Sequence, residues 1–311
     1  MKIFMTGGTG FVGASLTRRL IEGGHRVTVL TRKAPSGSDR PEVEGLSCLQ
    51  ADPTLAGAWQ ERVPDHDVVV NLGGASIFRK WDRKSKQLIR NSRIQITTRL
   101  VEALSRAPKR NRTFISASAV GYYGFHKDEV LDEESPPGDD FLASVTRDWE
   151  AVAARARASG ARVVICRLGI VLGKAGGAIG KLVPLFRKGL GCPLGSGNQW
   201  MSWIHQKDLI DIYLFAMNSR DLSGPINCTA PEPVTNRELT RALGKALGKP
   251  AILPPVPGFV IKALKGEFGA TLLEGQCVVP KRLLTAGFQF RFPNIASAFS
   301  NLFGEDRRTG T

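Results

Sequence analysis

Residues 6–13 read TGGTGFVG, a run that combines a glycine-rich turn with the start of a helical pattern. A short β-rich run at residues 2–5 precedes it, and apolar residues at helical spacing follow over residues 11–21. Glycines in such a strand–turn–helix context let a diphosphate approach the backbone, and the helix N-terminus offers free N–H groups. The spacing predicts a dinucleotide-binding loop formed by Gly7, Gly8, Thr9, Gly10, Phe11, Val12 and Gly13.

The end of the second expected strand, RVTVL at residues 26–30, indicates which dinucleotide binds. An NAD site places Asp or Glu there to accept hydrogen bonds from the adenine ribose. This chain has Thr31, Arg32 and Lys33 instead, and two adjacent cations suit a 2′-phosphate. We therefore predict NADP(H), with a solvated basic loop as the alternative. Asp52, after the third expected strand, is a candidate contact of the adenine amino group.

The elements that must hold these residues alternate along the chain. Strands are expected at residues 46–50, 67–72, 113–116 and 162–166, with helices at 84–105 and 140–158 between the later ones. This order predicts an α/β fold, a doubly wound parallel sheet with a small C-terminal substrate lobe. Residues 1–172 should form the Rossmann domain, completed by about residues 200–230. Residues 173–311 should form a glycine-rich substrate loop and the lobe, which contains two amphipathic helices after residue 231.

Composition limits the classes of function. The 43 Lys and Arg residues against 28 Asp and Glu give a net charge of +15, but the cations are spread along the chain. That distribution favours anionic small molecules over nucleic acid. Five dispersed cysteines fit neither a disulfide framework nor a metal site, so no metal is expected. No apolar run approaches the ~20 residues of a membrane span and no signal peptide is visible, so a cytoplasmic location is expected. The oligomeric state stays open.

Several longer segments resemble a known family. TGGTGFVG, SASAVGYYG at residues 116–124 and RLGIVLG at residues 167–173 are similar to motifs of the extended short-chain dehydrogenase/reductases, which include nucleotide-sugar epimerases. A closer resemblance is to their epimerase-like, YfcH-like subfamily of NADP-dependent oxidoreductases. That resemblance covers essentially the whole chain and adds the segments RNSRIQITTRLVEAL, DWEAVA, GGAIGKLVPLFRKGLGCPLGSGNQWMSWIHQKDL and PKRLLTAGFQFRFP.

The resemblance implies further site residues. Leu72, Gly73 and Gly74 would pass the ribose and diphosphate of the cofactor, and Leu168 with Gly169 would back the nicotinamide. Ser118 would stand where the superfamily keeps a catalytic serine or threonine. The C-terminal segment would close over a small-molecule substrate.

One stretch departs from the family pattern. The superfamily carries a tyrosine, the proton donor, and a lysine four residues later, in the stretch that reads GDDFLASVTRDWE here. Aligning on Glu150 puts Leu142 and Thr146 in those places, and neither side chain can do that work. The fold does not transfer the chemistry by itself.

Four residues are candidates for the missing proton chemistry. Ser118 could orient a carbonyl, and Tyr122 or Tyr123 could point into the cleft, although both tyrosines would equally suit packing in a loop. His205 titrates near neutrality, but a histidine bonded near Asp208 to join two lobes is the competing interpretation. We expect an NADP(H)-dependent oxidoreductase or epimerase-like enzyme acting on a small carbonyl or hydroxyl compound. The alternative is a non-catalytic NADP(H)-binding or redox-sensing protein.

Overall fold

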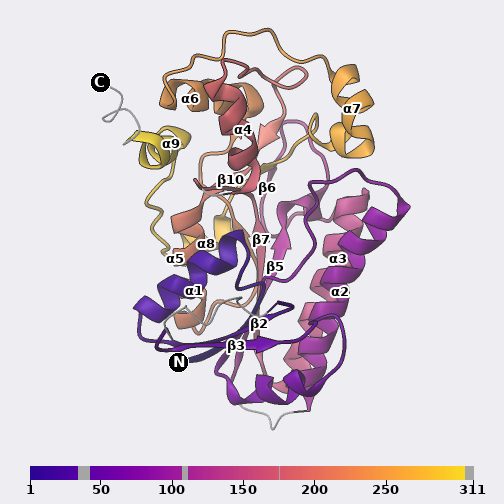
Figure 1. The fold of residues 1–311 in the computed structure, drawn as a ribbon, viewed down its shortest axis with the longest axis vertical. Coiled ribbons are helices and arrows are strands. Elements are labelled where there is room, and N and C mark those ends of the chain that lie inside the picture. The colour runs from indigo at the N-terminus through magenta and orange to yellow at the C-terminus, as the bar shows by residue number, and fades with distance from the viewer. Residues whose placement is uncertain (34–42, 107–110, 175, 305–311) are drawn as a thin grey trace.

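The computed structural model describes residues 1–33, 43–106, 111–174 and 176–304. Its centre is a seven-stranded parallel sheet in the order β11-β7-β5-β4-β1-β2-β3 (Figure 1). The direction of winding reverses between β1 and β4, and open α/β sheets bind their ligands at such a switch point, beyond the carboxyl ends of the strands. The strands are β1 (Lys2–Thr6), β2 (Arg26–Thr31), β3 (Leu46–Gln50), β4 (Val68–Asn71), β5 (Thr113–Ala119), β7 (Arg162–Leu168) and β11 (Gly224–Cys228).

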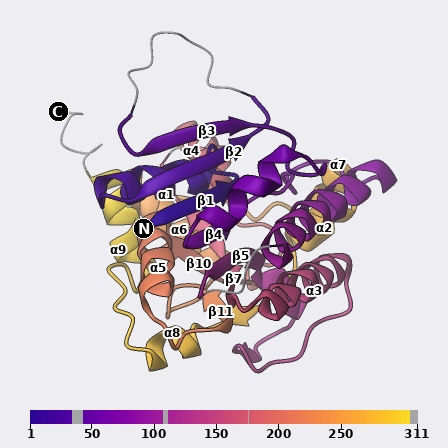
Figure 2. The same cartoon turned by 90° about the horizontal axis from the view of Figure 1, so that it is seen from below.

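Helices cover both faces of this sheet. Successive side chains of a strand point to opposite faces, so Ile3 packs with Leu16 of one helix layer and Phe4 packs with Leu100 of the other. Figure 2 shows the two layers on opposite sides. One contains α1 (Phe11–Glu22) and α5 (Gln206–Asn218), and the other contains α2 (Arg83–Ser105), α3 (Phe141–Ala154) and the 3-10 helices η1 (Ala58–Asp65) and η3 (Arg155–Ser159).

A second, smaller core lies in the C-terminal lobe, at the upper end of Figure 1. Trp203, Leu239 and Phe299 are among its buried side chains. Its helices are α4 (Gly177–Arg187), α6 (Asn236–Ala246), α7 (Gly258–Thr271) and α9 (Ile295–Phe303). Three short strand pairs accompany the two bodies: β8 (Ile170–Leu172) with β10 (Trp203–His205), β9 (Trp200–Met201) with β12 (Val234–Thr235), and β6 (Val130–Leu131) with β13 (Cys277–Val278).

The doubly wound fold is confirmed, with corrections at the ends of elements. β5 and β7 run further than expected, so Ser118 and Leu168 lie within strands. After residue 231 the described part of the chain contains four helices rather than two, among them the short α8 (Lys281–Thr285). The segment around α8 leaves the lobe and returns to the sheet, where Leu283 and Phe288 join the core that includes Ile226. No helix of the described part is long and apolar enough to span a membrane.

Candidate cofactor and active site

The glycine loop between β1 and α1 lies against the end of β4. Gly7 has φ +71°, and a side chain there would place its Cβ 2.5 Å from the Leu72 carbonyl oxygen. A Cβ on Gly13 would lie 2.1 Å from the Gly7 carbonyl oxygen. These two glycines are required by the turn itself. Gly10 differs, because its Cβ would meet only the Gly7 carbonyl oxygen, at 3.2 Å, on the open side of the loop.

The N-terminus of α1 faces this open side without a protein cap. Gly10 is the N-cap residue, no side chain caps the helix, and its first turn carries no acidic residue. The N–H groups of the first turn and the positive end of the helix dipole are therefore available to a negative group. Because the loop also stands between the ends of β1 and β4, this cradle fits the diphosphate of a dinucleotide.

Phe11 explains part of the glycine-rich segment that follows β8. A Cβ on Gly173 or on Gly176 would lie within 2.8 Å of the Phe11 ring. The Gln206 side chain donates to the Phe11 carbonyl oxygen at 2.9 Å. The first residue of the helix is thus held by the start of the C-terminal lobe, a contact that the sequence pattern did not indicate.

Arg32 and Lys33 are exposed directly after β2, and no acidic residue occupies the end of that strand. The Thr31 hydroxyl donates to the Lys33 carbonyl oxygen at 3.1 Å and shapes this turn. Asp52 accepts hydrogen bonds from the hydroxyl and the N–H of Thr54, which keep the pKa of Asp52 below its usual value. The end of β2 therefore presents two cations and no carboxylate, as expected for a site that binds a 2′-phosphate.

The loop after β4 contains Leu72, Gly73 and Gly74, and it lies beside the first glycine loop. A Cβ on Gly73 would lie 2.8 Å from the Ile96 side chain, so glycine is required for packing on α2. After β7, a Cβ on Gly169 would lie 2.7 Å from the Ser202 carbonyl oxygen. Packing against the lobe therefore explains why residue 169 is glycine. The contact of Gly169 with a nicotinamide stays a prediction.

Ser118 belongs to a buried ionic network that the sequence did not reveal. Its hydroxyl donates to Glu150 Oε1 at 2.6 Å, and Arg167 binds both oxygens of the same carboxylate at 2.9 and 2.8 Å. All three residues are buried. A serine that polarises a carbonyl must donate its only O–H to the substrate, but this proton is already given to Glu150. The network argues against the expected role of Ser118.

The two neighbouring tyrosines differ in their surroundings. Tyr123 is fully buried, accepts from Arg167 at 2.9 Å and donates to Asn227 at 2.7 Å. Burial raises the pKa of Tyr123 to about 12, so this phenol is a structural group. Tyr122 is only partly buried, and its ring centroid lies 3.5 Å from Cζ of the Arg167 guanidinium. Among the described residues, the Tyr122 hydroxyl makes no hydrogen bond. Tyr122 is therefore the phenol that remains available for proton transfer.

His205 is 1% exposed and lies at the N-terminus of α5. Its Nδ1 accepts from the Lys207 N–H at 3.0 Å, and its ring centroid lies 4.0 Å from that of Phe292. Burial, together with the Lys207 charge, lowers the pKa of His205 to about 4. A buried and neutral histidine is a poor acid, so the catalytic role expected for His205 is not supported. The competing interpretation fits better, because His205 bonds to Lys207, the residue before Asp208, and Asp208 accepts from the N–H groups of Arg291 and Phe292.

Leu142 and Thr146 occupy the first turns of α3. A Cβ on Gly121 would lie 3.3 Å from Leu142 Cβ, which places this leucine beside the residue that precedes Tyr122. Leu142 also packs in an apolar cluster with Trp81 and Phe268. The Thr146 hydroxyl donates to carbonyl oxygens one turn earlier in its own helix. In place of the proton-donating tyrosine of the family pattern stands the apolar Leu142. In place of the lysine stands Thr146, whose hydroxyl is bonded within its own helix.

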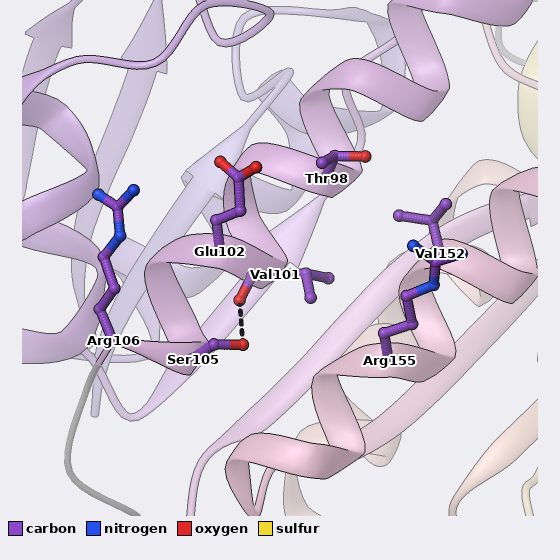
Figure 3. A pocket seen from close by; sticks show the side chains of 7 residues that line it. All are labelled: Thr98, Val101, Glu102, Ser105, Arg106, Val152 and Arg155. Carbon is purple, nitrogen blue, oxygen red and sulfur yellow. Dashed lines mark hydrogen bonds between the residues drawn. The ribbon is translucent and has the colours of Figure 1, made fainter.

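In the part of the chain that the structure describes, no cluster of His, Cys, Asp and Glu could hold a metal ion. A hollow of about 400 Å³ opens between α2 and the end of α3 (Figure 3). None of the predicted site residues lines it; its lining residues are Thr98, Val101, Glu102, Ser105, Arg106, Val152 and Arg155.

A doubly wound sheet with a glycine loop and an uncapped helix at its switch point defines a dinucleotide-binding Rossmann protein. The chain belongs to the NAD dependent epimerase/dehydratase family, whose model matches residues 3–228. Residues 256–302 match a domain of unknown function, DUF1731.

Similar proteins extend over nearly the full chain. The epimerase family protein SDR39U1 homolog, chloroplastic, of Arabidopsis thaliana is 40% identical over 96% of this chain and 85% of its own length. The epimerase family protein SDR39U1 of Bos taurus is 39% identical over 97% and 99%. The crystal structure of human SDR39U1 (isoform 2) with NADPH is 35% identical, covers 98% of this chain and 99% of the human chain, and has a TM-score of 0.86.

Proposed function

We propose that this chain binds NADP(H) and transfers hydride between the nicotinamide and a small carbonyl or hydroxyl compound. The observation that carries the proposal is the uncapped start of α1 beside Gly10, with Arg32 and Lys33 at the end of β2. The similar human structure that contains NADPH supports the same cofactor. The bound cofactor would supply the hydride.

The residues of the chain would divide the remaining work. Gly7 and Gly10 with the first turn of α1 would hold the diphosphate, and Arg32 with Lys33 would bind the 2′-phosphate. Tyr122 would exchange the proton with the substrate oxygen, because it is the less buried member of the tyrosine pair. Its ring stacks on the Arg167 guanidinium, which is in turn bound by the Glu150 carboxylate.

Cofactor preference tests the first half of this proposal. NADPH should bind at least ~10-fold tighter than NADH, since a charge-assisted hydrogen bond contributes about 1.5–3 kcal/mol. The variant Arg32→Asp should erase or invert the preference. Titration of intrinsic fluorescence with both nucleotides measures it, and equal affinities in the unmutated protein would refute the assignment of NADP(H).

A specific observation favours a second function, a non-catalytic NADP(H)-binding or redox-sensing protein. Leu142 and Thr146 replace the catalytic pair, and the Ser118 proton is held by Glu150. A panel of small aldehydes and ketones incubated with NADPH separates the two functions. Cofactor oxidation that depends on one carbonyl compound supports the enzyme, whereas tight binding without oxidation across the panel supports the sensor.

A further inference from the structure

The chain between α6 and the middle of α7 exposes large apolar side chains. Ile252 is 84% exposed, and Phe259 and Leu264 are each 75% exposed. This segment is drawn in orange and runs along the upper end of the C-terminal lobe in Figure 1. Apolar side chains that gather on one part of a surface usually mark a place where a partner binds. This end of the lobe is therefore a candidate docking face.

A break in α7 explains why its first half is exposed. Gly266 has φ +60° and ψ −140°, a non-helical conformation that favours glycine. Beyond this break Phe268 is buried, and its ring centroid lies 5.6 Å from that of Trp81. Before the break, Ile261 is the buried residue of the helix. Residues 258–265 are therefore held to the lobe along one side, and the rest of their surface lies in solvent.

Apolar and basic side chains occupy different sides of this exposed half. An α-helix turns by about 100° per residue, so the apolar side chains from Phe259 to Leu264 span an arc of about 140°. Lys262 and Lys265 fall outside that arc. The buried Ile261 lies between the two groups, on the side that faces the lobe. The helix thus presents an apolar side and a basic side to solvent.

The loop that carries Ile252 is held in place by backbone hydrogen bonds. The Val256 N–H donates to the Pro193 carbonyl oxygen at 2.9 Å, and the Val256 carbonyl oxygen accepts from the Gly195 N–H at 2.9 Å. Two prolines precede Val256 and restrict the backbone further. Little conformational freedom of this loop would therefore be lost on docking.

No acidic residue interrupts the segment. Residues 245–266 contain four lysines and no Asp or Glu. Among these lysines, Lys249, Lys262 and Lys265 are exposed and make no ion pair within the described residues. Glu267, the next residue along the chain, is already engaged in an ion pair. A partner that carries negative charge can therefore approach the apolar side chains without electrostatic repulsion.

The charge of this face decides between possible partners. A second copy of the chain would bring lysines against lysines, which opposes self-association through identical faces. A bilayer takes up projecting apolar side chains wherever they lie on the docking face, and its anionic headgroups attract lysines. Exposed apolar side chains flanked by lysines are typical of helices that lie in the membrane interface.

We propose that this end of the lobe binds the surface of an anionic phospholipid bilayer. Phe259 and Leu264 would enter the boundary between headgroups and acyl chains, with Ile252 beside them. Lys262 and Lys265 would bind the lipid phosphates. The attachment would be peripheral, since no helix of the described part is long and apolar enough to span the bilayer. It would leave the proposed cofactor loop free, because Gly10 belongs to the Rossmann body.

Flotation of the full chain with vesicles tests the proposal. Phosphatidylcholine vesicles that contain about one third phosphatidylglycerol should carry the protein up a density gradient, whereas pure phosphatidylcholine vesicles should not. Phe259→Ser should lower the partition onto the anionic vesicles at least ~10-fold, as should Leu264→Ser, since an apolar side chain no longer leaves water. Lys262→Gln together with Lys265→Gln should lower it about 5-fold for each lysine removed.

Matched controls carry the same changes elsewhere on the surface. Leu284→Ser removes an apolar side chain that is 49% exposed on α8. Arg18→Gln together with Arg19→Gln removes two exposed cations from α1. Both controls should float as the unmutated protein does. Thermal melts check that every variant is folded under the conditions of the assay.

The remaining outcomes would overturn the proposal. An unmutated protein that stays at the bottom of the gradient does not bind the bilayer. Equal losses in the α1 control and in the α7 lysine variant would indicate general adsorption of a basic protein. Full flotation of Phe259→Ser would contradict the apolar contact. A dimer in analytical ultracentrifugation that Phe259→Ser converts to a monomer, without vesicle binding, would assign the face to a second copy.

Discussion

At the scale of single residues, burial separates side chains that look equivalent in the sequence. Tyr122 and Tyr123 are adjacent aromatic residues, but Tyr123 has two buried hydrogen-bond partners, whereas the partly buried Tyr122 stacks on Arg167. The family resemblance makes Ser118 a candidate, but its proton is donated to the Glu150 carboxylate. Sequence spacing places such residues near one another but does not assign their partners.

The tyrosine pair gives a residue-scale prediction. Tyr122→Phe should lower kcat about 10²- to 10⁴-fold, the usual effect of losing a general acid, with an unchanged free energy of unfolding. Tyr123→Phe should instead lower the free energy of unfolding by about 1–3 kcal/mol, since Arg167 and Asn227 lose a buried partner. Steady-state rates and denaturant unfolding of both variants measure the difference. Equal effects of the two substitutions on kcat would contradict the assignment.

At the scale of elements, the turn from β1 into α1 positions the site. Its glycines have two separate duties, because Gly7 and Gly13 allow the chain to pass the end of β4 while Gly10 borders open space. The same division applies to the glycines after β8, where Gly173 and Gly176 make room for Phe11. Some glycines in a motif typical of phosphate binding are therefore required by packing rather than by the ligand.

Substitutions in the loop separate these duties. Gly10→Val should abolish NADPH binding in a folded protein, because the backbone at Gly10, with φ −79° and ψ 178°, accepts a side chain that would occupy the cofactor's space. Gly7→Ala should lower the free energy of unfolding by about 1–3 kcal/mol or more, since its φ of +71° is strained for alanine. Thermal melts and NADPH titrations report the two properties. Normal NADPH affinity in Gly10→Val would show that the cofactor binds elsewhere.

At the scale of the whole molecule, the C-terminal chain fastens the lobe to the Rossmann body. Asp208 at the start of α5 accepts the N–H groups of Arg291 and Phe292, and Phe292 packs on the ring of His205. His205, a catalytic candidate in the sequence, thus contributes to the contact between the lobe and the Rossmann body.

This junction predicts a pH dependence of stability. Burial lowers the pKa of His205 from 6.5 to about 4, so between these values the unfolded chain binds more protons and stability falls as the pH falls. His205→Asn retains an N-cap acceptor and cannot titrate, so its free energy of unfolding should depend on pH less steeply, by about one proton. Asp208, whose pKa burial raises, is common to both proteins. Chemical denaturation from pH 7 down to pH 4 measures both slopes, and identical slopes would contradict a buried neutral His205.

The doubly wound parallel sheet and the place of the glycine loop follow from the sequence pattern. The periodicity of apolar residues and the spacing of Gly7, Gly10 and Gly13 are local features that can be recognised without knowing tertiary contacts. The sequence also showed that the usual tyrosine and lysine are replaced by Leu142 and Thr146. The side chains that remain available for chemistry could not be predicted in this way, because burial and hydrogen-bond partners depend on residues far apart in the chain. The proton of Ser118, for example, is donated to a residue 32 positions away in the sequence.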